Sequence, residues 1–199
     1  MAVMHVTVDG AMVAAVDLAQ VDMFAVHLYG DLTSDHVASL SCHGGTYPDD
    51  GPSTFRIWVE QGLVEHAPIV TVTLADNAPA AQLTEGKTIA EMFPDQPPNE
   101  RTNFTPTPAE EEELRNRPRV REGFAWALRT STGVDLSGRK TADDDSFAFS
   151  VVWTQDQPTQ ARVNASTTNV ENVIRREGGT RLYNGMLNVG ESVTFRCGD

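Results

Sequence analysis

The sequence predicts a mainly β protein: an antiparallel β-sandwich or jelly roll, with one short helix near residues 108–117. Two observations support this fold class. Apolar residues alternate with polar ones in short runs rich in β-branched residues, most clearly at 54–60 (TFRIWVE) and 69–75 (IVTVTLA). A strand with one buried face requires this period of two. Turn dipeptides such as Asp9-Gly10 separate the runs at short intervals, as they do in sandwiches and barrels.

The first half of the chain is expected to form several strands in succession. The first run covers residues 2–8, and a second apolar run follows Gly10. Further runs lie at 21–29, 36–42, 54–60 and 69–75. A helical turn is the alternative for 36–42. Successive side chains of a strand point to opposite faces. The odd-numbered apolar residues of 54–60 are therefore expected on one face, and Arg56, Trp58 and Glu60 together on the other.

The middle of the chain differs in composition. Five prolines fall within residues 94–108, and proline cannot donate to a sheet, so this stretch is expected to be an extended connector. Thr107, Pro108 and Glu110 then form a helix-start signal, with the threonine as N-cap and the glutamate at the capping-box position. Pro118 is expected to end this helix. A weaker helix signal covers 88–93.

Strand signals resume in the second half, at residues 120–130, 146–154, 161–166 and 192–197. Asn184-Gly185 is a hairpin dipeptide and predicts a turn. The two β-rich stretches, 1–93 and 119–199, show no internal repeat that can be aligned by eye. We expect one domain over 1–199, with the Pro-rich crossover and short helix at 94–118, because each stretch alone is close to the size at which cores become marginal. Two small domains, 1–93 and 119–199, are the alternative.

Charge and hydropathy exclude several partners. The net charge is −13, and residues 1–100 hold 14 acidic residues but only two basic ones, Arg56 and Lys87. Negative potential disfavours nucleic acid and anionic membrane surfaces. No run approaches the length of a membrane-spanning helix, and the first ten residues lack the regions of a classical signal peptide. A cytoplasmic or virion-associated protein is expected, with Cys42 and Cys197 as free thiols. A disulfide between the two is the alternative if the chain is exported.

No catalytic motif is present. The serine elbow G-x-S-x-G and the glycine-rich phosphate loops are missing. His43 follows Cys42 directly, but neighbours on a strand point apart, so this adjacency does not make a nucleophile and base. The sequence therefore favours a protein that is not an enzyme and needs no cofactor.

A divalent metal is the alternative. All five histidines lie in the first 66 residues, and imidazole and carboxylate are ligands of zinc and similar metals. The candidate ligands are His36, His43 and Asp49, although their spacing matches no tight ligand motif. The acidic run Asp143-Asp144-Asp145 supplies hard oxygen donors for calcium, without the spacing of an EF-hand.

Trp58 is the candidate interface residue, because a tryptophan beside Arg56 and Glu60 on a polar strand face suits an interface or a binding surface. Three functions remain open. The first is a non-enzymatic binding or assembly protein, structural or virion-like, that recognises a protein partner or itself through a rigid β scaffold. The second is a lectin-like module for a carbohydrate or small ligand. The third is an enzyme with a barrel pocket or a metal centre in the His-rich half.

Overall fold

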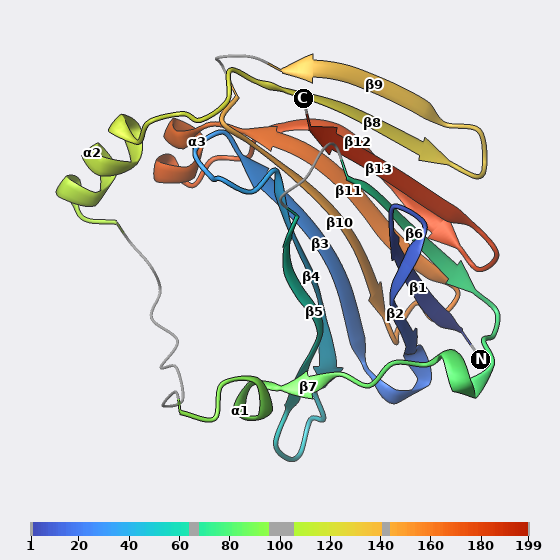
Figure 1. The fold of residues 1–199 in the computed structure, drawn as a ribbon. Coiled ribbons are helices and arrows are strands. Elements are labelled where there is room, and N and C mark those ends of the chain that lie inside the picture. The colour runs from blue at the N-terminus through green and yellow to red at the C-terminus, as the bar shows by residue number, and fades with distance from the viewer. Residues whose placement is uncertain (1, 64–67, 96–105, 141–143, 199) are drawn as a thin grey trace.

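The computed structural model describes residues 2–63, 68–95, 106–140 and 144–198 of the 199. Two antiparallel sheets pack face to face as a sandwich, which confirms the expected fold class (Figure 1). Sheet A has the order β2-β1-β6-β13-β8-β9, with β1 (Val3–Val8), β2 (Ala11–Asp17), β6 (Ile69–Ala75), β8 (Phe124–Thr130), β9 (Asp135–Lys140) and β13 (Ser192–Gly198). Sheet B has the order β12-β11-β10-β3-β4-β5-β7, with β3 (Met23–Asp31), β4 (Ala38–Thr46), β5 (Thr54–Leu63), β7 (Lys87–Thr88), β10 (Ser146–Thr154), β11 (Gln160–Thr168) and β12 (Thr180–Asn188).

The helices are short and lie outside the sheets. They are the 3₁₀ turns η1 (Leu18–Gln20) and η2 (Ala80–Gln82) and the α-helices α1 (Ile89–Met92), α2 (Pro108–Asn116) and α3 (Val170–Arg175). The helix predicted near 108–117 is confirmed as α2. Thr107 caps it, and Glu110 completes the capping box with hydrogen bonds back to Thr107. Residues 96–105, most of the predicted Pro-rich connector, lie outside the described residues.

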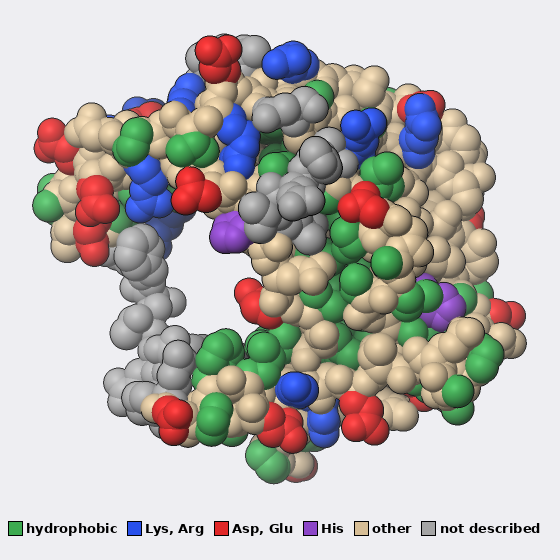
Figure 2. Space-filling model, viewed as in Figure 1, with side chains coloured by type: hydrophobic (Ala, Val, Ile, Leu, Met, Phe, Trp, Pro, Cys, Tyr) green, Lys and Arg blue, Asp and Glu red, His purple; other side chains and the backbone are tan. Residues whose placement is uncertain are grey.

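One hydrophobic core fills the space between the sheets. Phe24, Phe149 and Phe195 are almost fully buried, and the rings of Phe149 and Phe195 stack across the core with centroids 4.9 Å apart. On the face shown in Figure 2, hydrophobic side chains gather between the sheets, and many charged side chains lie around them. Both sheets contain strands from 1–93 and from 119–199, and both stretches contribute side chains to this core.

The structure contains an internal repeat that is not evident from the sequence. Unit 1 (β1–β6, residues 3–75) and unit 2 (β8–β13, residues 124–198) each place a hairpin in sheet A, a three-strand meander in sheet B and a return strand in sheet A. Equivalent strands meet in the middle of each sheet, where β6 pairs with β13 and β3 with β10. The order of sheet A therefore reads the same from both ends once equivalent strands are matched, as does that of sheet B apart from β7.

The two units also match in register. The β4–β5 pair carries a bulge between Cys42 and His43, and the β11–β12 pair carries one between Ala165 and Ser166, so the two bulges are 123 residues apart. The central pairs join equivalent residues at the same offset. Thr71 lies opposite Thr194 in sheet A, with their hydroxyl oxygens 3.0 Å apart. Such symmetric pairing describes a twofold relation between the units.

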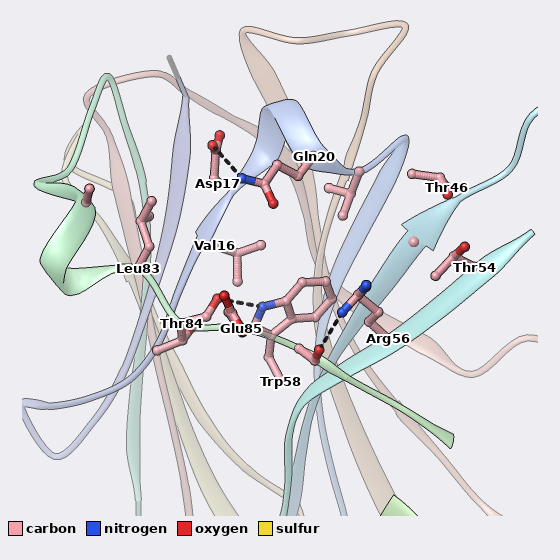
Figure 3. A pocket seen from close by; sticks show the side chains of 14 residues that line it. Val16, Asp17, Gln20, Thr46, Thr54, Arg56, Trp58, Leu83, Thr84 and Glu85 are labelled. Atoms are coloured by element: carbon pink, nitrogen blue, oxygen red, sulfur yellow. Dashed lines mark hydrogen bonds between the residues drawn. The ribbon is translucent and has the colours of Figure 1, made fainter. Parts of the chain in front are cut away.

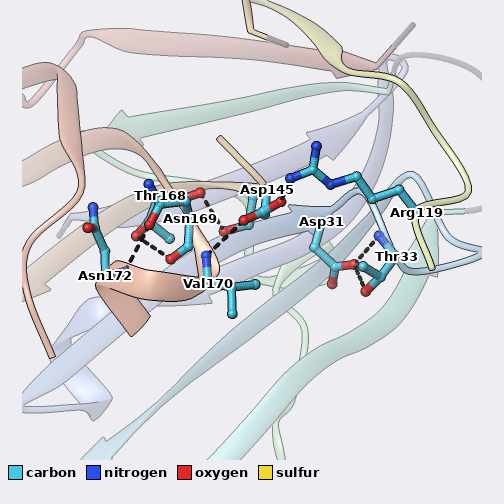
Figure 4. Close-up of polar contacts among 9 residues, drawn as sticks. Asp31, Thr33, Arg119, Asp145, Thr168, Asn169, Val170 and Asn172 are labelled. Carbon is cyan, nitrogen blue, oxygen red and sulfur yellow. Dashed lines mark hydrogen bonds and ion pairs between the residues drawn. The ribbon is translucent and has the colours of Figure 1, made fainter. Parts of the chain in front are cut away.

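An aspartate tie recurs at the end of the sandwich in each unit. Asp22 accepts a hydrogen bond from the backbone N–H of Tyr47, and Asp145 accepts one from Val170, with both partners 123 residues apart. The backbone N–H groups of the two aspartates also donate to equivalent carbonyls. Figure 4 shows the unit 2 site, where Asp145 additionally pairs with Arg119. The repeat therefore extends to individual polar contacts.

Several predicted elements need correction. Asn184 and Gly185 lie in the middle of β12, not in a hairpin turn. The Asn184 amide donates to Asn164 on the neighbouring strand, and the Tyr183 hydroxyl occupies the space beside Gly185 that a Cβ would need. Residues 36–42 were expected as a strand or a helical turn, and β4 begins only at Ala38. Strands β9 and β12 and helix α3 were not predicted.

Residues 76–93, named here the strap, cross one open side of the sandwich. Thr84 joins the edge of sheet A, because its backbone N–H and its hydroxyl group both bond to Ala15 of β2. Lys87 and Thr88 then form β7 on the edge of sheet B, opposite Ile57 and Arg56. The weak helix predicted at 88–93 is α1, which Thr88 caps with a capping box.

Candidate functional site

A pocket of about 530 Å³ lies on this side of the sandwich, between β2, β5 and the strap (Figure 3). The two sheets supply its walls and the strap supplies its outer border. The lining residues are Val16, Asp17, Gln20, Val21, Gly45, Thr46, Thr54, Arg56, Trp58, Ala80, Leu83, Thr84, Glu85 and Gly86. Ligand pockets are commonly concavities of roughly 300–1,000 Å³, so this one can hold a small molecule.

Trp58 lies in the middle of the lining (Figure 3). Its ring makes an edge-to-face contact with the buried Phe24, with centroids 5.3 Å apart and planes at 83°. Its indole N–H donates to the carbonyl of Thr84 at 3.0 Å. A Cβ on Gly86 would come within 2.7 Å of the ring, so the glycine lets the strap pass close to the indole. Trp58 is thus a half-buried wall residue held between core and strap.

The bulge in β5 explains this position and corrects the predicted strand faces. Val59 lies opposite Cys42 and Ile57 lies opposite His43, which leaves Trp58 as the extra residue. A bulge shifts the alternation of side chains by one position. Val59 is therefore buried on the core side, and Glu60, opposite Ser41, is exposed on the outer face of sheet B. Trp58 and Arg56 lie together as predicted, but Glu60 is not with them.

Charged and amide groups surround the indole. The Arg56 guanidinium donates to the carbonyl of Gly86 at 2.9 Å, which ties β5 to the strap. Asp17 is only 8% exposed, and its carboxylate accepts hydrogen bonds from the backbone N–H of Ala19 and the side-chain amide of Gln20. Glu85 adds a second carboxylate to the lining. The pocket therefore combines an aromatic ring with two carboxylates, an amide and a guanidinium.

The predicted metal ligands do not meet. Among the described residues, which include His36, His43 and Asp49, no group of three His, Cys, Asp or Glu side chains is placed to hold a metal ion. The ring of His36 covers Gly62 of β5. Asp143, a member of the acidic run considered for calcium, lies outside the described residues. Neither metal hypothesis gains support from this geometry.

His43 has a different neighbour, His27. Their rings stack with centroids 5.1 Å apart and planes at 13°, and Phe55 lies against His43 at 5.4 Å. Desolvation lowers the pKa of both histidines, and the nearby His43 lowers the pKa of His27 further. The pair lies away from the pocket, on the outer face of sheet B, because β3 and β4 direct Val26 and Cys42 into the core.

The two cysteines are buried thiols that form no disulfide. Desolvation raises the pKa of the Cys42 thiol to about 12, so it carries no thiolate at neutral pH. A cysteine nucleophile must reach the thiolate form, and Cys42 does not do so here. Cys42 packs in the core as a small apolar residue.

The equivalent positions of unit 2 do not repeat the pocket chemistry. At the same offsets from the bulge, Trp58 corresponds to Leu182 and Arg56 to Thr180. The registers of β1 with β6 and of β8 with β13 match Val3 with Ala125, and the residues opposite these two on β2 and β9 are Asp17 and Arg139. The aromatic ring, the guanidinium and the carboxylate are therefore features of unit 1 that the fold itself does not require.

No family model, no curated protein and no solved structure matches this chain. Among the helices of the described residues, none has the length and apolar character to cross a membrane.

Proposed function

We propose that this chain is a non-enzymatic binding protein that holds a small, hydroxyl-rich ligand such as a sugar in the pocket between β2, β5 and the strap. The observation that carries the proposal is the nearly buried Asp17 carboxylate on the wall of a pocket centred on Trp58. A tryptophan ring offers an apolar face to the C–H groups of a sugar. Carboxylate and amide groups accept and donate the hydrogen bonds that its hydroxyl groups need.

The composition of the lining favours this ligand class over an apolar one. Besides Trp58, its larger side chains are mostly polar or charged, and they include the threonines at 46, 54 and 84. The two carboxylates, Asp17 and Glu85, disfavour an anionic ligand by like-charge repulsion. The contacts of Trp58 and Arg56 with the strap hold both side chains in place before a ligand arrives, which reduces the entropic cost of binding.

A glycan array with the intact protein tests the proposal, followed by amide-shift mapping by NMR with the monosaccharides glucose, galactose, mannose and N-acetylglucosamine. We expect binding, with shifts that centre on Trp58, Thr84 and Gly86. The substitution Asp17→Asn should weaken binding of the retained sugar at least tenfold, because a hydrogen bond to a charged group contributes about 1.5–3 kcal/mol.

Asp135→Asn is the matched control, since it removes the same charge from an exposed position on β9 and should leave binding unchanged. An array without hits, together with no amide shifts from the four monosaccharides, would refute the proposal. Shifts confined to another part of the sandwich would refute the assignment of the site.

A further inference from the structure

The two units differ in what covers their sheet edges. In unit 1 the strap covers both edges: Thr84 bonds to Ala15 of β2, and β7 pairs with β5. In unit 2 the equivalent edge strands are β9 and β12. Both lie at the ends of their sheets, with no further strand beside them in the described part of the chain. An uncovered strand offers unpaired N–H and C=O groups to another chain.

Unit 1 shows what this type of edge accepts. The β7 residues Lys87 and Thr88 pair in antiparallel fashion with Ile57 and Arg56. Val59 and Tyr183 each follow the extra residue of their bulge, and they are 124 residues apart. At this offset Arg56 and Ile57 correspond to Thr180 and Arg181 of β12. The same bulged edge that binds an antiparallel strand in unit 1 is therefore open in unit 2.

The free side of β12 presents backbone donors in a regular row. The N–H of Val189 donates across to the carbonyl of Thr159, whereas the N–H of Asn188 donates to the Glu191 side chain. Backbone groups of an antiparallel strand alternate between its two sides. The N–H groups of Met186 and Asn184 therefore point to the free side, and the nine residues of β12 include one charged residue, Arg181. The other open edge, β9, carries Asp135, Arg139 and Lys140, charges that discourage pairing.

The charge distribution favours a second copy of this chain as the partner of β12. Residues 1–93 contain 12 acidic and two basic residues, whereas residues 119–199 contain ten of each. Two copies would repel each other through their first stretches and meet without repulsion through their second. A second copy also offers the same edge strand in the antiparallel orientation, as β3 and β10 do inside the chain. We propose that two copies of this chain pair through β12, antiparallel and about a twofold axis, to join their B sheets into one.

Sedimentation equilibrium over a range of protein concentrations tests this. The wild type should dimerise, and Met186→Glu should raise the dimer dissociation constant at least tenfold by placing two like charges at the joined edge. Met186 is 40% exposed and lies opposite Arg162 of β11, so a glutamate there is tolerated within one copy. Met12→Glu on β2, at a methionine that is 48% exposed, is the matched control and should leave the dimer intact.

Amide exchange of the unmodified protein gives an independent readout. The amides of Asn184 and Met186 should exchange more slowly at concentrations where the dimer forms than in dilute solution. A chain that stays monomeric at all concentrations would overturn the proposal. A dimer that resists Met186→Glu, or that Met12→Glu weakens equally, would overturn it as well.

Discussion

The two units of this sandwich share a strand arrangement and differ in the side chains that their strands present at exposed or half-buried positions. They agree in strand order, in the position of the bulge and in the aspartate tie at the end of the sandwich. They differ at the exposed or half-buried positions, where Trp58 of unit 1 corresponds to Leu182 and His27 to Ser150. The comparison teaches that a small set of buried and polar positions specifies this fold, and that the remaining positions are open to separate functions.

The bulge in the shared scaffold positions a residue of the candidate site. In both units it inserts one residue into the last strand of the meander, Trp58 in β5 and Leu182 in β12. The inserted residue lies beside another core-facing position, and Trp58 consequently contacts Phe24 of the core. The same backbone irregularity thus provides a wall residue for a pocket in unit 1 and an apolar residue in unit 2.

The largest expected effect tests whether the two units unfold together. Phe24 and Phe147 occupy equivalent positions in β3 and β10, and both are almost fully buried in the shared core. Truncation to alanine at either position should lower the free energy of unfolding by about 3–5 kcal/mol, from lost burial and the cavity left behind. Urea unfolding followed by fluorescence and circular dichroism should show one coincident transition for each variant.

Two separate transitions, with only one of them shifted by Phe24→Ala, would contradict the expectation that the two units unfold together. That outcome would mean that the units are independent folding units that only touch. Thr132→Ala, on the exposed turn between β8 and β9, is a suitable control and should change the free energy of unfolding by no more than about 0.5 kcal/mol.

A smaller effect is expected from the recurring aspartate tie. Asp22→Ala and Asp145→Ala each leave one backbone N–H, that of Tyr47 or Val170, without its carboxylate partner. Each loss should cost about 1–3 kcal/mol. Asp145 also pairs with Arg119, so its replacement should cost more than that of Asp22. Equal free energies of unfolding for both variants and the wild type would show that the aspartate hydrogen bonds recur in both units without contributing to stability.

The sequence predicted those features that depend on neighbouring residues. Alternation at 54–60 and 69–75 identified β5 and β6, and the signal at Thr107, Pro108 and Glu110 identified α2 almost to the residue. Local patterns succeed here because strand burial and helix capping involve residues close together in the chain.

Features set by the partner strand could not be predicted in this way. The dipeptide Asn184-Gly185 has the composition of a turn, but pairing with Asn164 and Val163 keeps it extended. The bulge at Trp58 depends on the register with β4, and the predicted position of Glu60 was wrong for that reason. For the candidate site, Trp58 and Arg56 were found from their strand, whereas Asp17 and Glu85 approach them only through the tertiary fold.

The internal repeat left faint traces in the sequence. Asp22, Phe24 and Ala25 are matched by Asp145, Phe147 and Ala148, at the offset of 123 residues. Val70-Thr71 is matched by Val193-Thr194 at the same offset. These identities fall on the strands where the units meet, or directly before them. They were too few and too scattered to align by eye, because a strand tolerates many residues that keep one apolar face.

The smallest expected effect concerns the histidine pair that unit 1 has and unit 2 lacks. Burial lowers the pKa of His27 and His43 below the usual value of 6.5, whereas an unfolded chain keeps that value. The unfolded state therefore binds more protons as the pH falls below about 6.5. The stability that the neutral pair contributes is fully present above that pH and is lost as the pH falls through the lowered pKa values.

Replacing both residues by their unit 2 counterparts, His27→Ser and His43→Ser, should reduce the fall in the free energy of unfolding between about pH 7.5 and 5. Burial also lowers the pKa of His5, and hydrogen bonds lower the pKa values of several glutamates, so a residual fall should remain in the double variant. Urea unfolding at several pH values measures it, and an unchanged pH dependence in the double variant would show that the stacked pair does not titrate with folding.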